Sequence, residues 1–161
     1  MNNDARQDKQ NKDTLVSLSD LGASKFIDVY YKVMDYSRNQ VTNFYRPTSK
    51  VKWNGSEIAQ NQLQQLWQKV PGSHHQLISV NAQPITVLGM SPTPPILITV
   101  NGKVSYLGSK PTFFSQTFVI GAEQVTNINN NNQQNGQQQP AQSAQYYIIS
   151  DIFRLQQEVT L

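Results

Sequence analysis

The sequence predicts an α+β domain in which helices pack on one face of a curved antiparallel sheet. Apolar residues recur at helical spacing over residues 21–45, where Leu21, Phe26 and Val29 begin the stripe. From His74 onward the period changes to two, which is typical of β-strands. Helices followed by a run of strands are the order expected of an α+β fold.

The composition indicates one domain without cysteine chemistry. The chain has 161 residues, a length typical of a single domain, and it contains no cysteine, which excludes disulfides and thiolate metal sites. Its net charge of +3 comes from scattered Lys and Arg residues that form no basic patch. No apolar stretch approaches the ~20 residues that span a bilayer, and the N-terminus lacks the apolar core of a signal peptide. We therefore expect a soluble intracellular protein with no membrane contact and no cofactor.

The domain is expected to begin at Ser19 and to span residues 19–156. Residues 1–18 are polar and show no periodicity, which predicts a disordered N-terminal segment. Ser19 is a good N-cap for the first helix. A kink or break in that helix is expected at residues 37–39, and residues 157–161 are expected to form a short tail.

Alternating apolar residues and turn signals predict the strands that follow. Asn54-Gly55 is a strong hairpin signal between two short strands, and a second helix is expected over residues 59–69. The expected strands are residues 50–53, 56–58, 75–84, 95–104, 113–121 and 145–154, and the third is expected to continue past a bend at Pro84 to Leu88. The Asn/Gln-rich segment 127–145 has too little apolar area to fold, so it is expected to be a mobile loop before the last strand.

The last strand carries apolar residues in both of its alternating phases. Tyr146, Ile148 and Ile152 lie in one phase, and Tyr147, Ile149 and Phe153 lie in the other. A strand with one face in water alternates apolar with polar residues. The helices can cover only one face of the sheet, so the second apolar face is expected to meet a partner. A barrel-like curl that buries part of this face is the alternative.

Two groups of ionisable residues could support chemistry, and each has a structural alternative. His74-His75 could bind a metal, but adjacent strand residues point to opposite faces, so we expect one packed and one solvent-exposed imidazole. Asp28 or Asp35 could form an acid–base pocket between helix and sheet, together with a tyrosine such as Tyr30 or Tyr31. The favoured interpretation is that both carboxylates lie on the solvated face of the helix.

Several motifs spread over residues 20–156 are shared with a known family. They include Val51-Lys52-Trp53-Asn54-Gly55, Asn81-Ala82-Gln83-Pro84, Phe114-Ser115-Gln116-Thr117-Phe118 and Tyr147-Ile148-Ile149-Ser150-Asp151-Ile152-Phe153-Arg154. Together they resemble the nuclear transport factor 2-like family, and within it the small subunits of messenger RNA export receptors. The resemblance implies a cone-shaped α+β domain with a strongly curved antiparallel sheet and helices packed on one face.

The resemblance implies a protein partner instead of a substrate. The sheet would pair with a homologous domain of the large export-receptor subunit. That heterodimer would carry messenger ribonucleoproteins through nuclear pores by binding Phe-Gly repeats of nucleoporins. The fungal members of the family also imply transport of large ribosomal subunits. The mildly basic net charge of +3 is compatible with weak direct contact with RNA. The protein would be non-enzymatic, lie in the nucleus and at the pore, and shuttle to the cytoplasm.

The resemblance also implies which residues form the partner interface. They are Arg154, Asp151, Phe153, Ile149, Tyr147, Gln116, Phe118, Phe114, Asn81, Gln83 and Pro84. Arg154 corresponds to an arginine that forms an ion pair with the large subunit. Asn81 stands where relatives carry an acid, so it can form a hydrogen bond but not a salt bridge there.

Two other functions are compatible with a cone fold. One is an isomerase or dehydratase, which needs a polar pocket with a tuned carboxylate. The sequence instead places bulky aromatic residues, such as Phe26 and Trp67, where that pocket would lie. The other is an import carrier for a small GTPase, which would form homodimers.

Overall fold

The structure is a computed structural model that describes residues 3–86, 93–123 and 145–156. Its helices are α1 (Asn3–Tyr36), the 3-10 helices η1 (Arg38–Phe44) and η2 (Gln60–Gln62), and α2 (Leu63–Lys69). Its strands are β1 (Tyr45–Trp53), β2 (Ser56–Ile58), β3 (Ser73–Pro84), β4 (Ile96–Tyr106), β5 (Thr112–Glu123) and β6 (Gln145–Leu155). The expected loop at 127–145 lies outside the described residues except for Gln145, and so does the expected tail at 157–161.

The six strands form one sheet in the order β2-β1-β6-β5-β4-β3. Neighbouring strands are antiparallel except for β1 and β6, which run parallel. The expectation of an antiparallel sheet therefore fails for one strand pair, and the sheet is mixed. No turn connects β1 to β6, so turn geometry does not fix their relative direction.

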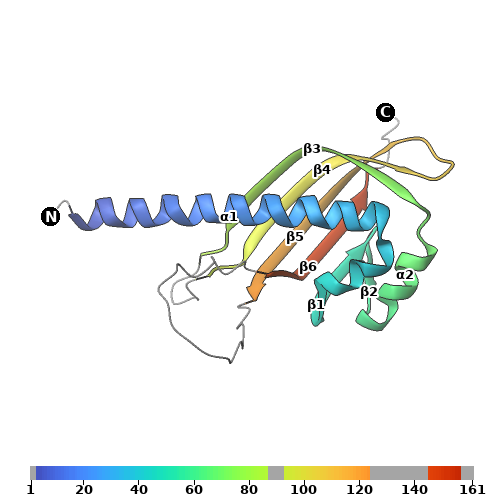
Figure 1. The fold of residues 1–161 in the computed structure, drawn as a ribbon, viewed down its shortest axis with the longest axis horizontal. Coiled ribbons are helices and arrows are strands. Elements are labelled where there is room, and N and C mark those ends of the chain that lie inside the picture. Colours follow the sequence, from blue (N-terminus) through green and yellow to red (C-terminus); the bar gives the residue numbers. More distant parts are fainter. Residues whose placement is uncertain (1–2, 87–92, 124–144, 157–161) are drawn as a thin grey trace, which may run out of the picture.

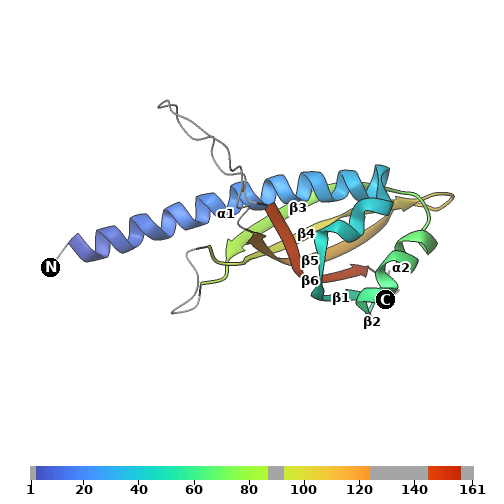
Figure 2. The same ribbon diagram turned by 60° about the horizontal axis from the view of Figure 1, so that its bottom comes forward.

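Helix α1 covers one face of this sheet. Figure 1 shows α1 crossing the strands obliquely, and Figure 2 shows it on one side of the sheet. The helix buries a stripe that includes Phe26, Tyr30 and Met34, each at most 4% exposed. The spacing of three to four residues is the expected one, but Leu21 and Val29, which are expected in the stripe, are 55% and 49% exposed, so that part of the prediction is wrong. The helix ends at Tyr36 and η1 begins at Arg38, which confirms the break expected near residues 37–39.

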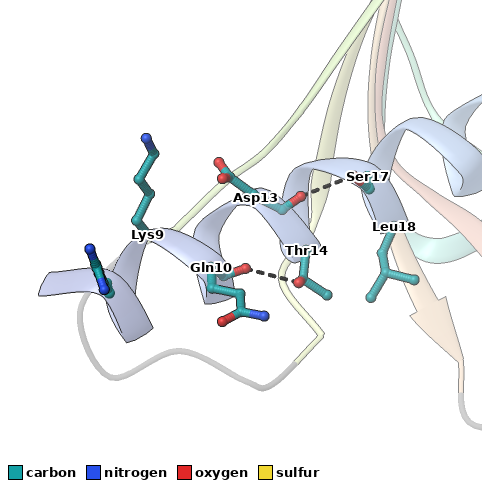
Figure 3. A pocket seen from close by; sticks show the side chains of 7 residues that line it. Lys9, Gln10, Asp13, Thr14, Ser17 and Leu18 are labelled. Carbon is teal, nitrogen blue, oxygen red and sulfur yellow. Dashed lines mark hydrogen bonds between the residues drawn. The ribbon is translucent and has the colours of Figure 1, made fainter. Parts of the chain in front are cut away.

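The first half of α1 differs from the sequence prediction. Residues 3–18 are helical, although disorder is expected there, and Figure 1 shows this half projecting beyond the sheet. Figure 3 shows local hydrogen bonds in it, one of them donated by the Thr14 hydroxyl to the carbonyl of Gln10. Ser17 donates in the same way to the carbonyl of Asp13. The packed half of α1 provides the helix nucleus, and extending an existing helix costs little per residue.

The Asn54-Gly55 hairpin forms as the sequence predicts. Both residues have positive φ angles, 50° and 87°, as a type I′ turn requires. The Asn54 side chain also accepts a hydrogen bond of 2.9 Å from the backbone N–H of Leu155. The turn that joins β1 to β2 is thereby tied to the end of β6.

A β-bulge in β6 changes which of its side chains face α1. Ile148 pairs with Ile120 and Ser150 pairs with Val119, which leaves Ile149 as the extra residue. The alternation shifts by one residue at this point, so Ile148 and Asp151 both face the covered side and are fully buried. The apolar residues that occupy both phases of this strand are therefore explained in part by the bulge.

The core lies between α1 and the sheet and is rich in aromatic rings. The Phe118 ring lies 4.9 Å from the Tyr30 ring and 5.4 Å from the Phe26 ring, between ring centroids, in edge-on geometry. Trp53 stacks on Phe153 at 3.9 Å. Within the described residues, none of the helices combines the length and the apolar character needed to cross a membrane.

Candidate functional site

The face of the sheet opposite α1, termed here the open face, has no described element over it (Figure 2). The strand register aligns two rows of side chains across this face. One row is Lys52, Ile152, Thr117, Thr99 and Asn81, and the other is Lys50, Ser150, Val119, Leu97 and Gln83. All ten residues are half-buried or exposed. The open face is therefore a mixed polar and apolar surface available for contact.

Ile152 forms a ridge between two hollows on the open face. Its side chain is 47% exposed. The first hollow lies toward β1 and is lined by residues that include Lys50, Lys52 and Ile152. The second lies toward β5 and is lined by residues that include Thr117, Ile152 and Arg154. A partner with a complementary surface could place side chains on both sides of the ridge.

The charges around this ridge are mostly cationic. Lys52 lies 3.6 Å from Glu57, and both side chains are exposed, so this pair neutralises only one lysine. Among the described residues, Lys50 and Arg154 have no ion-pair partner. Arg154 lies beside the hairpin, where a Cβ placed on Gly55 would come within 3.2 Å of its Nη1. Two unpaired cations thus flank the ridge.

Beneath the ridge, on the covered side, lies the buried carboxylate of Asp151. It accepts hydrogen bonds from Tyr45 Oη at 2.7 Å and from Gln116 Nε2 at 2.8 Å. Tyr30 Oη lies 3.5 Å from the carboxylate and 3.2 Å from Tyr45 Oη. Tyr31 Oη donates to Gln116 Oε1 at 2.8 Å, which fixes the orientation of that amide. The network joins α1, β1, β5 and β6 through satisfied polar groups.

Burial dominates the electrostatics of this network. Desolvation raises the pKa of Asp151 from its ordinary value of 3.8 to about 6, while the hydrogen bonds from Gln116, Tyr45 and Tyr30 act in the opposite direction. Burial and the nearby carboxylate also raise the pKa values of Tyr30 and Tyr45 well above 10. Asp151 is 0% exposed. A substrate therefore has no access to this carboxylate.

A second polar cluster ties the end of α1 to the start of β3. Asp35 Oδ1 lies 2.6 Å from His75 Nδ1, and Asp35 Oδ2 accepts a hydrogen bond of 2.8 Å from the His75 backbone N–H. Arg38 donates to the carbonyls of Val70 and Pro71. Burial alone would raise the pKa of Asp35, but the hydrogen bonds from His75 keep it below its ordinary value. The cluster is structural, since its donors and acceptors bind one another.

This cluster corrects one prediction and confirms another. Asp28 is solvated and pairs with Lys32 at 2.8 Å, but the Asp35 side chain is only 7% exposed, so the expected solvated position is wrong for Asp35. The carboxylate is buried because β3 begins directly over that turn of α1. His75 is packed and His74 is exposed, as expected. The described residues contain no group of three His, Asp or Glu side chains that could hold a metal ion.

Comparison with known proteins supports the resemblance. The family model of the nuclear transport factor 2 (NTF2) domain matches residues 22–155. The chain belongs to the NTF2 family. NTF2-related export protein 2 of Homo sapiens is 26% identical to this NTF2 domain over 144 residues, which cover 89% of this chain and 91% of that protein.

Solved structures share the fold of this NTF2 domain. Nuclear transport factor 2 from Cryptosporidium parvum superposes with a TM-score of 0.63 at 21% identity, over 85% of this chain and 94% of that one. A chain of the Mtr2–Mex67 M domain complex of C. albicans superposes with a TM-score of 0.55 at 16% identity, over 82% of this chain and 92% of that one. These likenesses confirm the predicted α+β cone.

Five of the predicted interface residues lie in the core of this NTF2 domain. They are Phe114, Gln116, Phe118, Asp151 and Phe153, each at most 1% exposed. These side chains face α1 and cannot touch a partner on the open face, so this part of the prediction is corrected. The error has a physical cause: a motif names consecutive residues, whereas alternate residues of a strand point to opposite faces.

The other predicted residues lie at or near the surface. Arg154, Asn81 and Gln83 are exposed on the open face. Tyr147 is half-buried across Gly121, with the Arg46 guanidinium 5.2 Å from its ring centroid. Two further predicted residues are half-buried: Ile149, which is the bulge residue, and Pro84, which pairs with Ile96 on the covered side.

Of the ten residues in the two rows, the sequence prediction names only Asn81 and Gln83, and the residues that it misses include Lys50 and Ile152. Ile152 is assigned to an apolar phase but not to the interface, because the bulge that turns it outward leaves no signal in the sequence. Lys50 alternates with the buried Val51, which is the available signal for an outward position. The parallel pairing of β1 with β6, which brings Lys50 beside Ser150, could not be read from that alternation.

Proposed function

We propose that this NTF2 domain is the small, non-enzymatic subunit of a heterodimeric nuclear export receptor. The observation that carries the proposal is the open face, where an apolar ridge and two unpaired cations lie on a sheet whose other face is covered. A relative over most of the chain is named an NTF2-related export protein. A neighbour in fold comes from a complex with the Mex67 M domain. The open face is the surface on which a partner sheet would pack.

In this proposal Arg154 forms an ion pair with an acidic residue of the large subunit. Its guanidinium is exposed and has no carboxylate partner among the described side chains. Asn81 and Gln83 lie on the open face at the β3 edge and would contribute hydrogen bonds there. Tyr147 and Ile149 would lie at the periphery of the contact. The buried Asp151 network has an indirect role, since it fixes the strand that presents Arg154.

The proposal extends to cargo and location. The heterodimer would bind Phe-Gly repeats of nucleoporins, carry messenger ribonucleoproteins and large ribosomal subunits, and shuttle between the nuclear pore and the cytoplasm. Direct RNA contact would be weak, because the Lys and Arg residues are scattered and the net charge is only +3.

An enzymatic role on the cone fold is disfavoured by the state of Asp151. A tuned carboxylate is present, with a pKa raised to about 6, but it is sealed by Tyr30, Tyr45 and Gln116. A general acid or base must come within hydrogen-bond reach of its substrate. An import carrier that forms homodimers would use the same open face, so it differs from the proposal in the identity of the partner.

Purification distinguishes these functions. The chain is expressed alone and together with the cognate large subunit, and the mass of each product is measured by size-exclusion chromatography with light scattering. We expect a stable 1:1 heterodimer, and we expect co-expression with the large subunit to increase the solubility of the chain. A folded, stable homodimer that does not exchange with the large subunit would contradict the proposal and favour the import carrier.

A further inference from the structure

We infer that the partner sheet carries two acidic positions that flank an apolar contact with Ile152, and that Lys50 is a second recognition cation beside Arg154. This inference rests on the proposed heterodimer and specifies the chemistry of its contact. The family resemblance implies one ion pair, at Arg154. The structure places a second free cation on the opposite side of the same ridge.

The geometry separates the two cations while keeping them on one surface. Ile152 pairs with Lys52 on β1 and with Thr117 on β5, so it lies in the middle of a three-strand patch. The hollow toward β1 includes Lys50, and the hollow toward β5 includes Arg154. Ile152 lines both hollows. If an apolar side chain of the partner packs on Ile152, the partner residues on one side of it lie over Lys50 and those on the other side lie over Arg154.

Charge complementarity identifies the groups that must fill these hollows. Among the described strand residues there are three carboxylates, and none of them neutralises Lys50 or Arg154. Asp151 is buried on the covered side, Glu123 pairs with Arg46 at 2.7 Å, and Glu57 lies beside Lys52. A cation buried at an interface without a partner is costly. Carboxylates must then come from the other subunit.

The surroundings of the ridge favour a folded protein over RNA. Bases bind single-stranded sites by stacking on aromatic rings. The open-face residues next to Ile152 are Lys52, Thr117, Ser150 and Arg154, which offer no ring for stacking. The exposed ring of Phe113 also lies on the open face, two residues before Ser115, with Lys103 Nζ 4.7 Å from its centroid, but it lines neither hollow beside Ile152. An apolar ridge flanked by single charges suits a side-chain contact between sheets.

The first test measures affinity of the purified chain for the cognate large subunit. Lys50→Glu is expected to weaken binding about tenfold or more, and the loss should shrink as salt is raised. Lys25→Glu is the matched control, because Lys25 is also exposed but lies on α1, on the other side of the sheet. It should leave the affinity unchanged. Equal affinity of Lys50→Glu and wild type would overturn the inference while leaving the heterodimer intact.

A second test identifies the acidic partner directly. A carbodiimide couples a lysine amine to a carboxylate in contact with it, and mass spectrometry locates the link. We expect Lys50 to link to an Asp or Glu of the large subunit, and Lys50→Arg to lose this link while retaining affinity. Links from Lys50 to Glu57 alone would overturn the inference. If wild type forms no heterodimer, the proposed function fails and this inference fails with it.

RNA binding is the competing outcome. If Lys50→Glu weakens binding of a single-stranded polyuridine 20-mer but not of the large subunit, the ridge is a nucleic-acid surface, and the inference is wrong. If polyuridine binding is the same for wild type and the variant while the large subunit binds less tightly, the inference is supported.

Discussion

The two faces of the sheet show how one set of strands can serve two purposes. On β5, Gln116 and Phe118 are at most 1% exposed beneath α1, whereas Ser115 and Thr117, which alternate with them, are half-buried on the open face. The covered face is complete, because its carboxylate, tyrosines and amide satisfy one another. The open face is incomplete, because it carries cations without partners. Stability therefore depends on the first face and recognition on the second.

The largest expected effect is a loss of stability on the covered face. Phe118→Ala removes a fully buried ring that contacts Phe26 and Tyr30, so it should lower the free energy of unfolding by about 3–5 kcal/mol. Urea unfolding of the purified chain or heterodimer measures this change. Thr117→Ala, one residue away on the open face, should change it by less than about 0.5 kcal/mol. Equal losses for both variants would remove the distinction between the faces.

The next effect is a pH dependence that belongs to the covered face alone. Burial raises the pKa of Asp151 from 3.8 to about 6, so the carboxyl group binds a proton more tightly in the folded protein than in the unfolded chain. The stabilisation is fully present below pH 3.8 and is lost as the pH rises through 6. The rise in pKa corresponds to a decrease of about 3 kcal/mol in the free energy of unfolding across this pH range. Asp151→Asn should lack this loss between pH 4 and 7.

Unfolding curves at several pH values within that range check this prediction. The free energy of unfolding of Asp151→Asn minus that of wild type should increase with pH. Asp28→Asn is the control, since Asp28 is exposed on α1, and its difference from wild type should stay flat. Parallel pH profiles for Asp151→Asn and wild type would mean that the carboxylate is not desolvated as the structure indicates.

Much of the fold could be predicted because its signals act over a few residues. Asn54-Gly55 specifies its own turn by tolerating positive φ, and the β-rich segments from His74 onward locate β3 to β6. The start of β1 is missed, since β1 begins at Tyr45 and the expected strand begins at Lys50. It is harder to predict which face of the sheet each side chain points to, because one extra residue in a strand reverses the alternation beyond it. Ile149 is such a residue, and it hides the fact that Asp151 and Ile148 share a face. A bulge depends on the paired strand, so one strand read alone does not reveal it.

The candidate site is harder to predict than the fold for the same reason. Asp151 and Arg154 are close in the sequence, and the family motif predicts that both lie at the interface. In the structure Asp151 is buried in the core and Arg154 is exposed. Lys50 enters the site only through the parallel pairing of β1 and β6, which is a long-range property of the sheet. Tyr45 and Tyr30, which contact the Asp151 carboxylate, come from two other elements. Long-range pairing of this kind leaves no periodicity in a single sequence.

An intermediate effect is expected for binding on the open face. Arg154→Ala should weaken heterodimer formation by about 2 kcal/mol, because the partner carboxylate would be left buried without its counter-charge. The same variant should leave the stability of the isolated domain unchanged, since Arg154 is exposed. A titration by isothermal calorimetry together with thermal unfolding separates the two quantities. Unchanged affinity would remove Arg154 from the interface.

The smallest expected effect concerns the part of α1 that covers neither face. Side chains of residues 5–14 are exposed, and burial on α1 becomes substantial only from Ser19 onward. Figure 3 shows that the polar groups there bond within the helix itself, as Thr14 does to the Gln10 carbonyl. Deletion of residues 1–14 should therefore lower the free energy of unfolding by less than about 1 kcal/mol.

Circular dichroism and urea unfolding of the truncated chain measure this effect. Helical signal should fall while the unfolding midpoint stays close to that of wild type, because the packed residues Phe26, Tyr30 and Met34 remain. A large loss of stability would show that the projecting half of α1 supports the covered face. A loss of affinity for the large subunit without a loss of stability would instead show that the projecting half of α1 contacts the partner. Recognition would then depend on this helix as well as on the open face.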